Sequence, residues 1–559
     1  MTSKLDRETG KLQYPEALRD ARCRDYLRPV RVVYTSGGEL KPENADALLR
    51  ADSHQVYVHF APPMCRMKRG SAIVLDFGIE LNGGIRITTG YNNHVPSPVR
   101  IRFGESVSEA MHTPDNDHAM HNTVVDLPSM GTVEIGNTGF RFVRIEVMDN
   151  APEAVDIQAV MAVAIYRDLP YVGSFQCSDE RLNRIWQVGA YTVHLNMQDY
   201  IYDGIKRDRL VWMGDLHPEI KVICNVFDDV DAVQSSLDFL RDRTALPNFM
   251  NGMSPYSLWW IISQHDWYLA RGNFSYLQEQ REYLLELLHL FAGHVSEDGA
   301  EHLEVGRFLD WPSNDNPAAI HAGLQGLMAW AFQAGENLCS YLGAEAAAKE
   351  CAACRNKLLR HSPDGGMSKQ ANAFKVIAGI DDAKEVNARV LAVDPFHGVS
   401  TFMGYYILRA RAEAGDVDGA LDVVRKYWGG MLDFGATTFW EDFDLRWTEN
   451  AGRIDELPVA GKKDLHADFG NYCYKGLRHS LCHGWAGGPT AWLSEYVLGV
   501  KPVEPGYKTV SVKPELGDLD WAEGQVPTPY GTIRVRAEKA ADGSVTVSIE
   551  APEGVTILR

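Results

Sequence analysis

The chain has 559 residues, of which 45% are hydrophobic and 23% charged, and its formal net charge at pH 7 is -20. This length predicts two to four domains, each large enough to bury its own core. The negative charge would repel a phosphate backbone, and there is no run of about eighteen apolar residues to span a bilayer, so we expect neither nucleic acid nor a membrane as a partner.

The composition gives no sign of export or of a disulfide framework. The first ten residues, MTSKLDRETG, lack the apolar core of a secretory signal, so we expect either a cytoplasmic location, which we favour, or a leader that has been removed. The nine cysteines are scattered, and the only close pair, Cys351 and Cys354, has neither a second pair nor histidines beside it. We therefore expect reduced thiols and no zinc site.

The segment Val30–Ile165 alternates between apolar and polar side chains, with turn residues between the runs, which predicts a β-domain. Val99, Ile101 and Phe103 are expected to face its core. In Phe140–Val147 the alternation slips by one residue, as a β-bulge would produce.

After Ser178 the pattern changes to helical blocks, and helices are expected to dominate as far as Val500. Ser400–Ala414 is an example, because it opens with a Ser-Thr capping pair and closes at Gly415. The helical part has room for about twelve helices with ordinary loops, the number that a double ring of six helical hairpins needs.

From Lys501 the strand pattern returns. Thr532–Glu538 and Ser544–Glu550 predict a hairpin with its turn at Asp542-Gly543. The predicted domains are an N-terminal β-domain of residues 1–170, a helical domain of residues 171–500 and a C-terminal β-domain of residues 501–559.

The densest polar cluster is Asp203–Asp215, with three carboxylates, three cations and a tryptophan in thirteen residues. Burying a charged group unpaired costs several kcal/mol, so these charges must be paired if they are buried. The cluster predicts either a partly desolvated pocket, with one protonated carboxyl group and another ionised beside an arginine, or a structural network of ion pairs.

A second cluster follows a glycine at Gly435–Asp444, where Glu441 comes directly after Trp440. Glu441 is expected at the mouth of a cavity with Trp440 as a platform for a sugar ring, because pyranose rings present apolar C–H faces to aromatic side chains. The alternative is a capped helix start with Trp440 in the core. For every other tryptophan, packing in the core is likewise the competing interpretation.

Neither a metal nor a nucleotide cofactor is expected. Gly83-Gly84 fits neither a P-loop nor a dinucleotide fingerprint. Four histidines are considered as metal ligands, and none lies in an H-E-x-x-H motif or an equivalent spacing: His217, His265, His397 and His483.

The two polar clusters resemble the two signatures of glycoside hydrolase family 78, the α-L-rhamnosidases, and the likeness covers nearly the whole chain. The Gly-Ala-Thr-Thr-Phe-Trp-Glu run that ends at Glu441 is similar to the second signature. The first signature is matched in register by Asp203, Arg207, Asp208, Trp212, Gly214 and Asp215. Weaker likenesses follow in the family's order at Ser178–Trp186, at Leu309-Asp310-Trp311 and at the helix of His483.

The resemblance implies an N-terminal β-sandwich, a central (α/α)6 barrel and a small C-terminal β-sandwich. It also implies an inverting exo-glycosidase that removes terminal α-L-rhamnosyl residues without a metal, with Asp208 as general acid and Glu441 as general base. Arg207 would tune the ionisation of the cluster. The remaining substrate-binding residues would be Asp203, Trp212, Asp215, Asp310, Trp311, Trp440 and His483.

Two positions depart from the family pattern. The family's general acid is usually Glu, and Asp208 is one methylene shorter, a loss of reach of about an ångström. Val211 replaces a glycine of the first signature. Either the pocket is rebuilt around Asp208 or another residue is the acid; Glu219 is the reserve candidate, with a helix cap as its competing role.

Inversion predicts carboxyl groups about 6.5–9.5 Å apart, whereas about 5 Å would indicate retention. Two rival functions stay open. One is a glycosidase of the same fold that cleaves a different glycosidic bond or a uronide, whose carboxylate Lys206, Arg207 or Arg209 would bind. The other is a carbohydrate-binding relative that does not hydrolyse its ligand. The aglycone, the linkage and the oligomeric state are left open.

Overall fold

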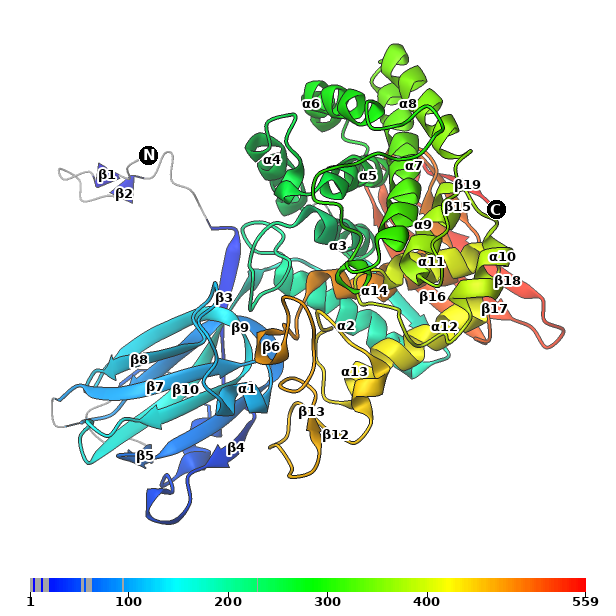
Figure 1. The fold of residues 1–559 in the computed structure, drawn as a ribbon. Helices are drawn as coiled ribbons and strands as arrows, with labels where there is room; N and C mark the ends of the chain where they lie inside the picture. Colours follow the sequence, from blue (N-terminus) through cyan, green and yellow to red (C-terminus); the bar gives the residue numbers. More distant parts are fainter. Residues whose placement is uncertain are drawn as a thin grey trace.

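The computed structural model describes residues 4–5, 12–13, 20–51, 55–56, 63–92, 95–228 and 230–559. In chain order it has a sheet of long strands, a large group of helices, and a second group of strands that lies against the helices, away from the first sheet (Figure 1). In these ranges, no helix combines the length and the apolar character needed to cross a membrane.

Eight strands near the N-terminus form one antiparallel sheet in the order β3-β10-β6-β9-β7-β8, with β4 paired to β6 and β5 to β10. Their bounds are β3 Arg22–Leu27, β4 Arg31–Thr35, β5 Cys65–Lys68, β6 Ala72–Thr89, β7 Ser97–Gly104, β8 Asn122–Leu127, β9 Thr132–Val147 and β10 Ala154–Arg167. A separate short pair is formed by β1 Lys4–Leu5 and β2 Leu12–Gln13.

The sheet confirms the predicted strand pattern. Val99, Ile101 and Phe103 are buried in a core made of β-domain residues alone. The pairing of β6 with β9 is irregular between Phe140 and Phe142, as the slipped alternation predicted, but the extra residues lie on β6 and not in the Phe140–Val147 segment. After β7 comes the short helix α1, Val107–Met111.

The middle of the chain is helical. The α-helices are α2 Glu180–Asn196, α3 Met213–Val226, α4 Asp231–Arg243, α5 Ser254–Arg271, α6 Phe274–Ala292, α7 Pro317–Tyr341, α8 Glu345–Leu358, α9 Lys369–Ala378, α10 Ala383–Val386, α11 Gly404–Glu413, α12 Val417–Val423, α13 Gly429–Asp433 and α14 Gly488–Trp492. Helical turns of the π type continue α10, join α12 to α13 and continue α14, at Asn387–Leu391, Val424–Trp428 and Leu493–Val497.

The helix predicted at Ser400–Ala414 is α11, and the predicted start was wrong by four residues. Ser400 has a φ of 64°, outside the helical region, and the Thr401 hydroxyl donates to the backbone carbonyl of Glu441 at 2.5 Å. Thr401, which the capping pattern assigned to the start of the helix, therefore makes a tertiary hydrogen bond instead, and the helix begins at Gly404.

The C-terminal strands form two small sheets. The predicted hairpin is confirmed as β17 Gly531–Lys539 and β18 Val545–Glu550, which belong to the order β11-β16-β17-β18 with β16 Trp521–Thr528. The other sheet joins β14 Val500–Pro502, β15 Thr509–Val512 and β19 Thr556–Leu558, and an isolated pair joins β12 Ala451–Gly452 to β13 Lys463–Asp464. The strand β11, Ser174–Cys177, was not expected, because it lies within the predicted helical domain, just before the first long helix.

The two β-regions are attached to the helices in different ways. Phe175 on β11 and Val535 on β17 belong to the same hydrophobic core as the helices. The N-terminal sheet instead makes polar contacts: Arg141 binds the Asp76 carboxylate at 2.8 and 3.0 Å and donates to the backbone carbonyl of Gly435 at 3.0 Å. The N-terminal sheet therefore reaches the Glu441 segment directly.

Because β11 lies in the shared core, Phe175→Ala should destabilise the helices as well as the C-terminal sheet. Phe175 is 2% exposed, and removing a buried phenylalanine side chain costs about 3–5 kcal/mol. Urea unfolding followed by the far-ultraviolet circular dichroism of the helices measures this cost. The control is Phe274→Ala, where the side chain is 42% exposed and the expected change is within about 0.5 kcal/mol. Equal midpoints for the two variants would contradict the shared core.

Candidate active site

Asp203 organises the connection between α2 and α3 that carries the first polar cluster. Its Oδ2 accepts the backbone N–H of Asp208 at 3.0 Å, and its Oδ1 accepts that of Leu210 at 2.9 Å. Burial raises the pKa of Asp203 to about 6. These two hydrogen bonds therefore fix the backbone of the segment that carries Asp208.

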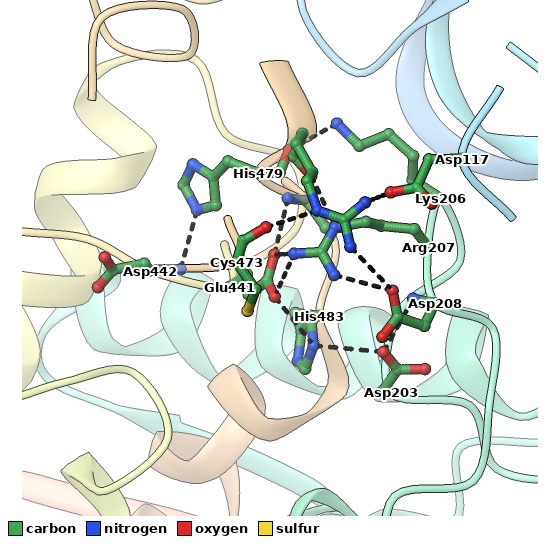
Figure 2. Close-up of polar contacts among 12 residues, drawn as sticks. Asp117, Asp203, Lys206, Arg207, Asp208, Glu441, Asp442, Cys473, His479 and His483 are labelled. Carbon is green, nitrogen blue, oxygen red and sulfur yellow. Dashed lines mark hydrogen bonds and ion pairs between the residues drawn. The ribbon is translucent and has the colours of Figure 1, made fainter. Parts of the chain in front are cut away.

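The Arg207 guanidinium joins the two carboxylates that the sequence singled out (Figure 2). Its Nη2 donates to both oxygens of Glu441 at 2.7 Å, and its Nη1 donates to Asp208 Oδ1 at 3.0 Å. Its Nε donates to the backbone carbonyl of Arg478 at 2.8 Å. Residues 234 positions apart in sequence thus meet at one buried cation.

Glu441 is fixed by its surroundings as well as by Arg207. Its backbone N–H donates to the Ser480 carbonyl at 2.9 Å, and its Oε2 accepts the Ser480 N–H at 3.0 Å. The Glu441 carbonyl accepts from Trp485 Nε1 at 2.9 Å. Burial raises the pKa of Glu441 to about 7, although Arg207 opposes the shift, so this carboxyl group titrates near neutral pH.

Asp208 is the more accessible member of the pair. Its side chain is 18% exposed, compared with 3% for Glu441. Two further groups lie near its Oδ1: His118 Nε2 at 3.7 Å, from the N-terminal β-domain, and Arg478 Nη2 at 3.8 Å. The exposed side of Asp208 therefore faces a boundary between two domains.

His483 lies among three buried carboxyl groups. Its Nε2 is 3.7 Å from Asp203 Oδ2, 3.9 Å from Asp215 Oδ1 and 3.8 Å from Glu441 Oε1. Burial and the charge of Arg207 hold the pKa of His483 well below its usual value, so the ring is neutral. Asp215 is in the first turn of α3, and burial raises its pKa well above the usual range. The structure thus brings together six predicted site residues, Asp203, Arg207, Asp208, Asp215, Glu441 and His483.

The predicted aromatic walls differ in exposure. Trp212 and Trp311 are half-buried, and Trp311 stacks on Tyr472 with ring centroids 5.8 Å apart. Trp440 has no exposed surface and packs edge-on against Phe443 at 5.5 Å. In this conformation Trp440 is a core residue and offers no platform to a ligand.

Asp310 and Glu219 are buried carboxyl groups outside the Arg207 cluster. Asp310 accepts the Ser313 N–H at 2.9 Å, its Oδ2 has no hydrogen-bond partner among the described residues, and burial raises its pKa to about 6. Glu219 lies in the middle of α3, so the expected role as a helix cap is wrong. Its Oε1 is buried beside Gly484, without a hydrogen-bond partner in the part of the chain that the structure describes.

Sequence reasoning missed two carboxylates of the β-domain, Glu105 and Glu109. Both lie 3.1 Å from Lys206 Nζ, which also donates to the carbonyls of Leu477 and His479 at 2.9 and 2.5 Å. The Ser106-x-x-Glu109 spacing is a sequence signal for a helix start, but it gives no indication of the Lys206 partner. Together with His466, the two carboxylates have a spacing that could hold a metal ion, yet the Lys206 ammonium supplies the cation there.

The cations beside Asp208 are engaged within the protein. Lys206 is paired as described above, and Arg209 donates to the Asn82 and Asn137 side-chain oxygens at 2.9 and 3.0 Å. Arg207 is shared between Glu441 and Asp208. The polar cluster is therefore an internal network of ion pairs as well as a candidate site.

Two domain families match the chain. The bacterial alpha-L-rhamnosidase six-hairpin glycosidase domain matches residues 170–320, and the bacterial alpha-L-rhamnosidase C-terminal domain matches residues 499–558. Residues 170–320 are therefore similar to a six-hairpin glycosidase domain. The predicted resemblance to the α-L-rhamnosidases of glycoside hydrolase family 78 is confirmed.

Individual relatives are distant and mostly longer. An alpha-L-rhamnosidase of Alteromonas sp. (strain LOR) is 24% identical over 527 residues, covering 85% of this chain and 54% of that protein. The chain spans about half the length of the curated relatives it matches.

Several solved structures share the fold. The family 78 rhamnosidase of Bacillus sp. GL1 has a TM-score of 0.71 and 22% identity, covering 91% of this chain and 55% of that one. A rhamnosidase of Klebsiella oxytoca with rhamnose bound has a TM-score of 0.69 and 20% identity, covering 85% and 96%.

Burial raises the pKa of Glu109 from its ordinary 4.5 to about 7, so the folded state holds this proton more tightly than the unfolded chain. Its contribution to stability is therefore present below pH about 4.5 and lost as the pH rises through about 7. In Glu109→Gln this part of the pH dependence should disappear, because glutamine has no carboxyl group to titrate. Urea unfolding at pH 5 and pH 8 measures the difference. Glu456→Gln, an exposed control, should keep the slope of the parent; an unchanged slope in Glu109→Gln would refute the assignment.

Proposed function

We propose that the chain is an inverting exo-glycosidase that hydrolyses terminal α-L-rhamnosyl residues. The observation that carries this proposal is the Arg207 bridge, because it brings Asp208 and Glu441 to one side-chain cluster. The matching domains and the curated relatives named alpha-L-rhamnosidase support the substrate class, as does the related Klebsiella structure with rhamnose bound.

The proposed architecture is an (α/α)6 barrel of residues 171–500 between β-sandwiches of residues 1–170 and 501–559. The likeness to family 78 structures and the change from strands to helices along the chain support it. The strand β11 is an addition, since it pairs with β16 from the C-terminal region.

In the proposed mechanism Asp208 is the general acid, and its exposed surface lets a leaving-group oxygen approach. Glu441 is the general base, which takes a proton from water on the opposite face of the sugar. A carboxylate has about four lone-pair sites, so Glu441 can accept from Arg207 and Ser480 and still bind a water. The Arg207 charge keeps Glu441 ionised at the pH where burial alone would protonate it.

The sugar site would be formed around His483. Asp203 and Asp215 would bind hydroxyls, and His483, being neutral, would add a hydrogen bond without a charge. Trp212 and Trp311 would form the walls, since both keep exposed surface. This arrangement favours a neutral deoxysugar over a uronate.

Release of free sugar from a panel of aryl glycosides tests the substrate. We expect hydrolysis of the α-L-rhamnoside with first formation of the β-anomer of rhamnose, which nuclear magnetic resonance detects. Faster hydrolysis of another glycoside, or none of any, would remove the rhamnosidase assignment. First formation of the α-anomer would replace inversion by retention.

Glu441→Gln should lower kcat by about 10²–10⁴-fold, the usual contribution of a general base, with little change in rhamnose binding. In the parent, kcat/KM should rise with pH through about 7, because Glu441 must lose its proton to act. Steady-state rates from pH 5 to 8 measure both effects. Glu456→Gln is the matched control; it removes an exposed carboxylate and should leave rates and pH profile unchanged. Full activity of Glu441→Gln would contradict its role.

A further inference from the structure

A cavity of about 330 Å³ lies among the helices, and its volume is in the range of small-molecule sites. Its walls come from the second halves of α3, α5 and α7, from α11, from the π-type turn after α14 and from β14. Asp215 of the candidate active site is in the first turn of α3, and the wall residue Lys221 lies about 9 Å further along the same helix. No member of the Arg207 cluster lines this cavity, so it is separate from the candidate active site.

One group of charges in the cavity is paired within the protein. The Lys221 ammonium lies 3.1 Å from Asp266 Oδ2 and 2.9 Å from Glu495 Oε1. Asp266 Oδ1 also lies 3.3 Å from His265 Nδ1, and Glu495 accepts from the Tyr405 hydroxyl at 2.6 Å. Both carboxylates therefore have protein donors, and a cationic ligand would have to displace them.

Two other cations keep hydrogen-bond donors that no protein group uses. Arg409 donates from Nε to Glu413 at 2.8 Å, and its guanidinium carbon lies 5.0 Å from the Trp330 ring centroid. In the described ranges its Nη1 and Nη2 make no hydrogen bond, and they carry four of the five N–H donors of an arginine. The Lys501 ammonium lies 3.3 Å from the Tyr496 ring centroid and has no ion-pair partner among the described residues.

The unused donors, and not the net charge, distinguish this cavity. Its formal charges balance, because three cations face three carboxylates: Lys221, Arg409 and Lys501 against Asp266, Glu413 and Glu495. An anion is therefore not repelled by the lining. Burial lowers the pKa of Lys501 to about 8, so the ammonium is still largely protonated at pH 7. A half-buried cation without an acceptor is costly, and an oxyanion would supply the missing acceptors.

We propose that this cavity binds a phosphate group, either as inorganic phosphate or as the ester of a small molecule. A phosphate group carries about 1.5 to 2 negative charges at pH 7, which matches the unused donors of two cations, whereas a carboxylate matches one. Arg409 holds two phosphate oxygens through Nη1 and Nη2, and Lys501 binds as a point charge. Trp330, Tyr405 and Tyr496 provide walls for the rest of an ester.

Isothermal titration calorimetry of the full chain with inorganic phosphate, glucose 6-phosphate and glucose tests this site. We expect both phosphates to bind and glucose to give no saturable heat. Lys501→Met and Arg409→Lys should each weaken the binding of both phosphates about tenfold or more, the loss expected for one charge-assisted hydrogen bond. Arg409→Lys keeps the charge and removes the two parallel donors. Whichever phosphate binds more tightly to the parent identifies the form that the cavity takes.

Lys426→Met is the matched control, because Lys426 lies 4.2 Å from the Phe396 ring centroid and does not line the cavity. It should keep the affinity of the parent. Melting temperatures without phosphate establish that the variants fold. No binding of either phosphate, equal binding of glucose, an unchanged affinity in Lys501→Met or Arg409→Lys, or an equal loss in Lys426→Met would overturn the phosphate site.

Discussion

The structure of the candidate site depends on the buried guanidinium of Arg207. Taking a cation and two carboxylates out of water costs several kcal/mol for each ion, and this cost is offset only where geometry and hydrogen bonds are good. Arg207 meets that condition with donors at 2.7 Å to Glu441 and 3.0 Å to Asp208. Removing the Arg207 side chain would leave Glu441 buried without a cation to compensate its charge.

The neighbouring Lys206 is also a buried cation that needs carboxylate partners, and these come from the N-terminal β-domain. Its ammonium is buried between Glu105 and Glu109, and Glu105 also accepts the backbone N–H of Leu481 at 2.6 Å. The β-domain carboxylates therefore hold both the Arg207 segment and the Ser480–Leu481 segment that fixes Glu441. The N-terminal β-domain, which has its own hydrophobic core, thus contributes to the site through ion pairs and hydrogen bonds. The C-terminal strands instead share the hydrophobic core of the helices.

Burial gives this site carboxyl groups that titrate near neutral pH. The pKa is raised to about 6 in Asp203 and to about 7 in Glu441, in each case chiefly by desolvation. The neutral His483 adds no positive charge that would lower them. Such a cluster can both hold and release protons at physiological pH, which acid and base catalysis requires.

The sequence by itself determined the features that depend on neighbours along the chain. Period-two alternation located Val99, Ile101 and Phe103 in a β-core, and Asp542-Gly543 located the hairpin turn, because strand faces and turns are set by local backbone geometry. The density of charge at Asp203–Asp215 indicated paired burial, since isolated buried charges are too costly.

Only the tertiary structure decided which charges pair and which aromatic rings stay exposed. Lys206 pairs with Glu105 and Glu109 across about a hundred residues, and no local signal encodes that partner. Trp440 is fully buried and Trp311 is not, although both were predicted to bind the substrate. Burial and electrostatic pairing are properties of packing between distant segments, so local sequence patterns predict that partners are needed and the fold selects them.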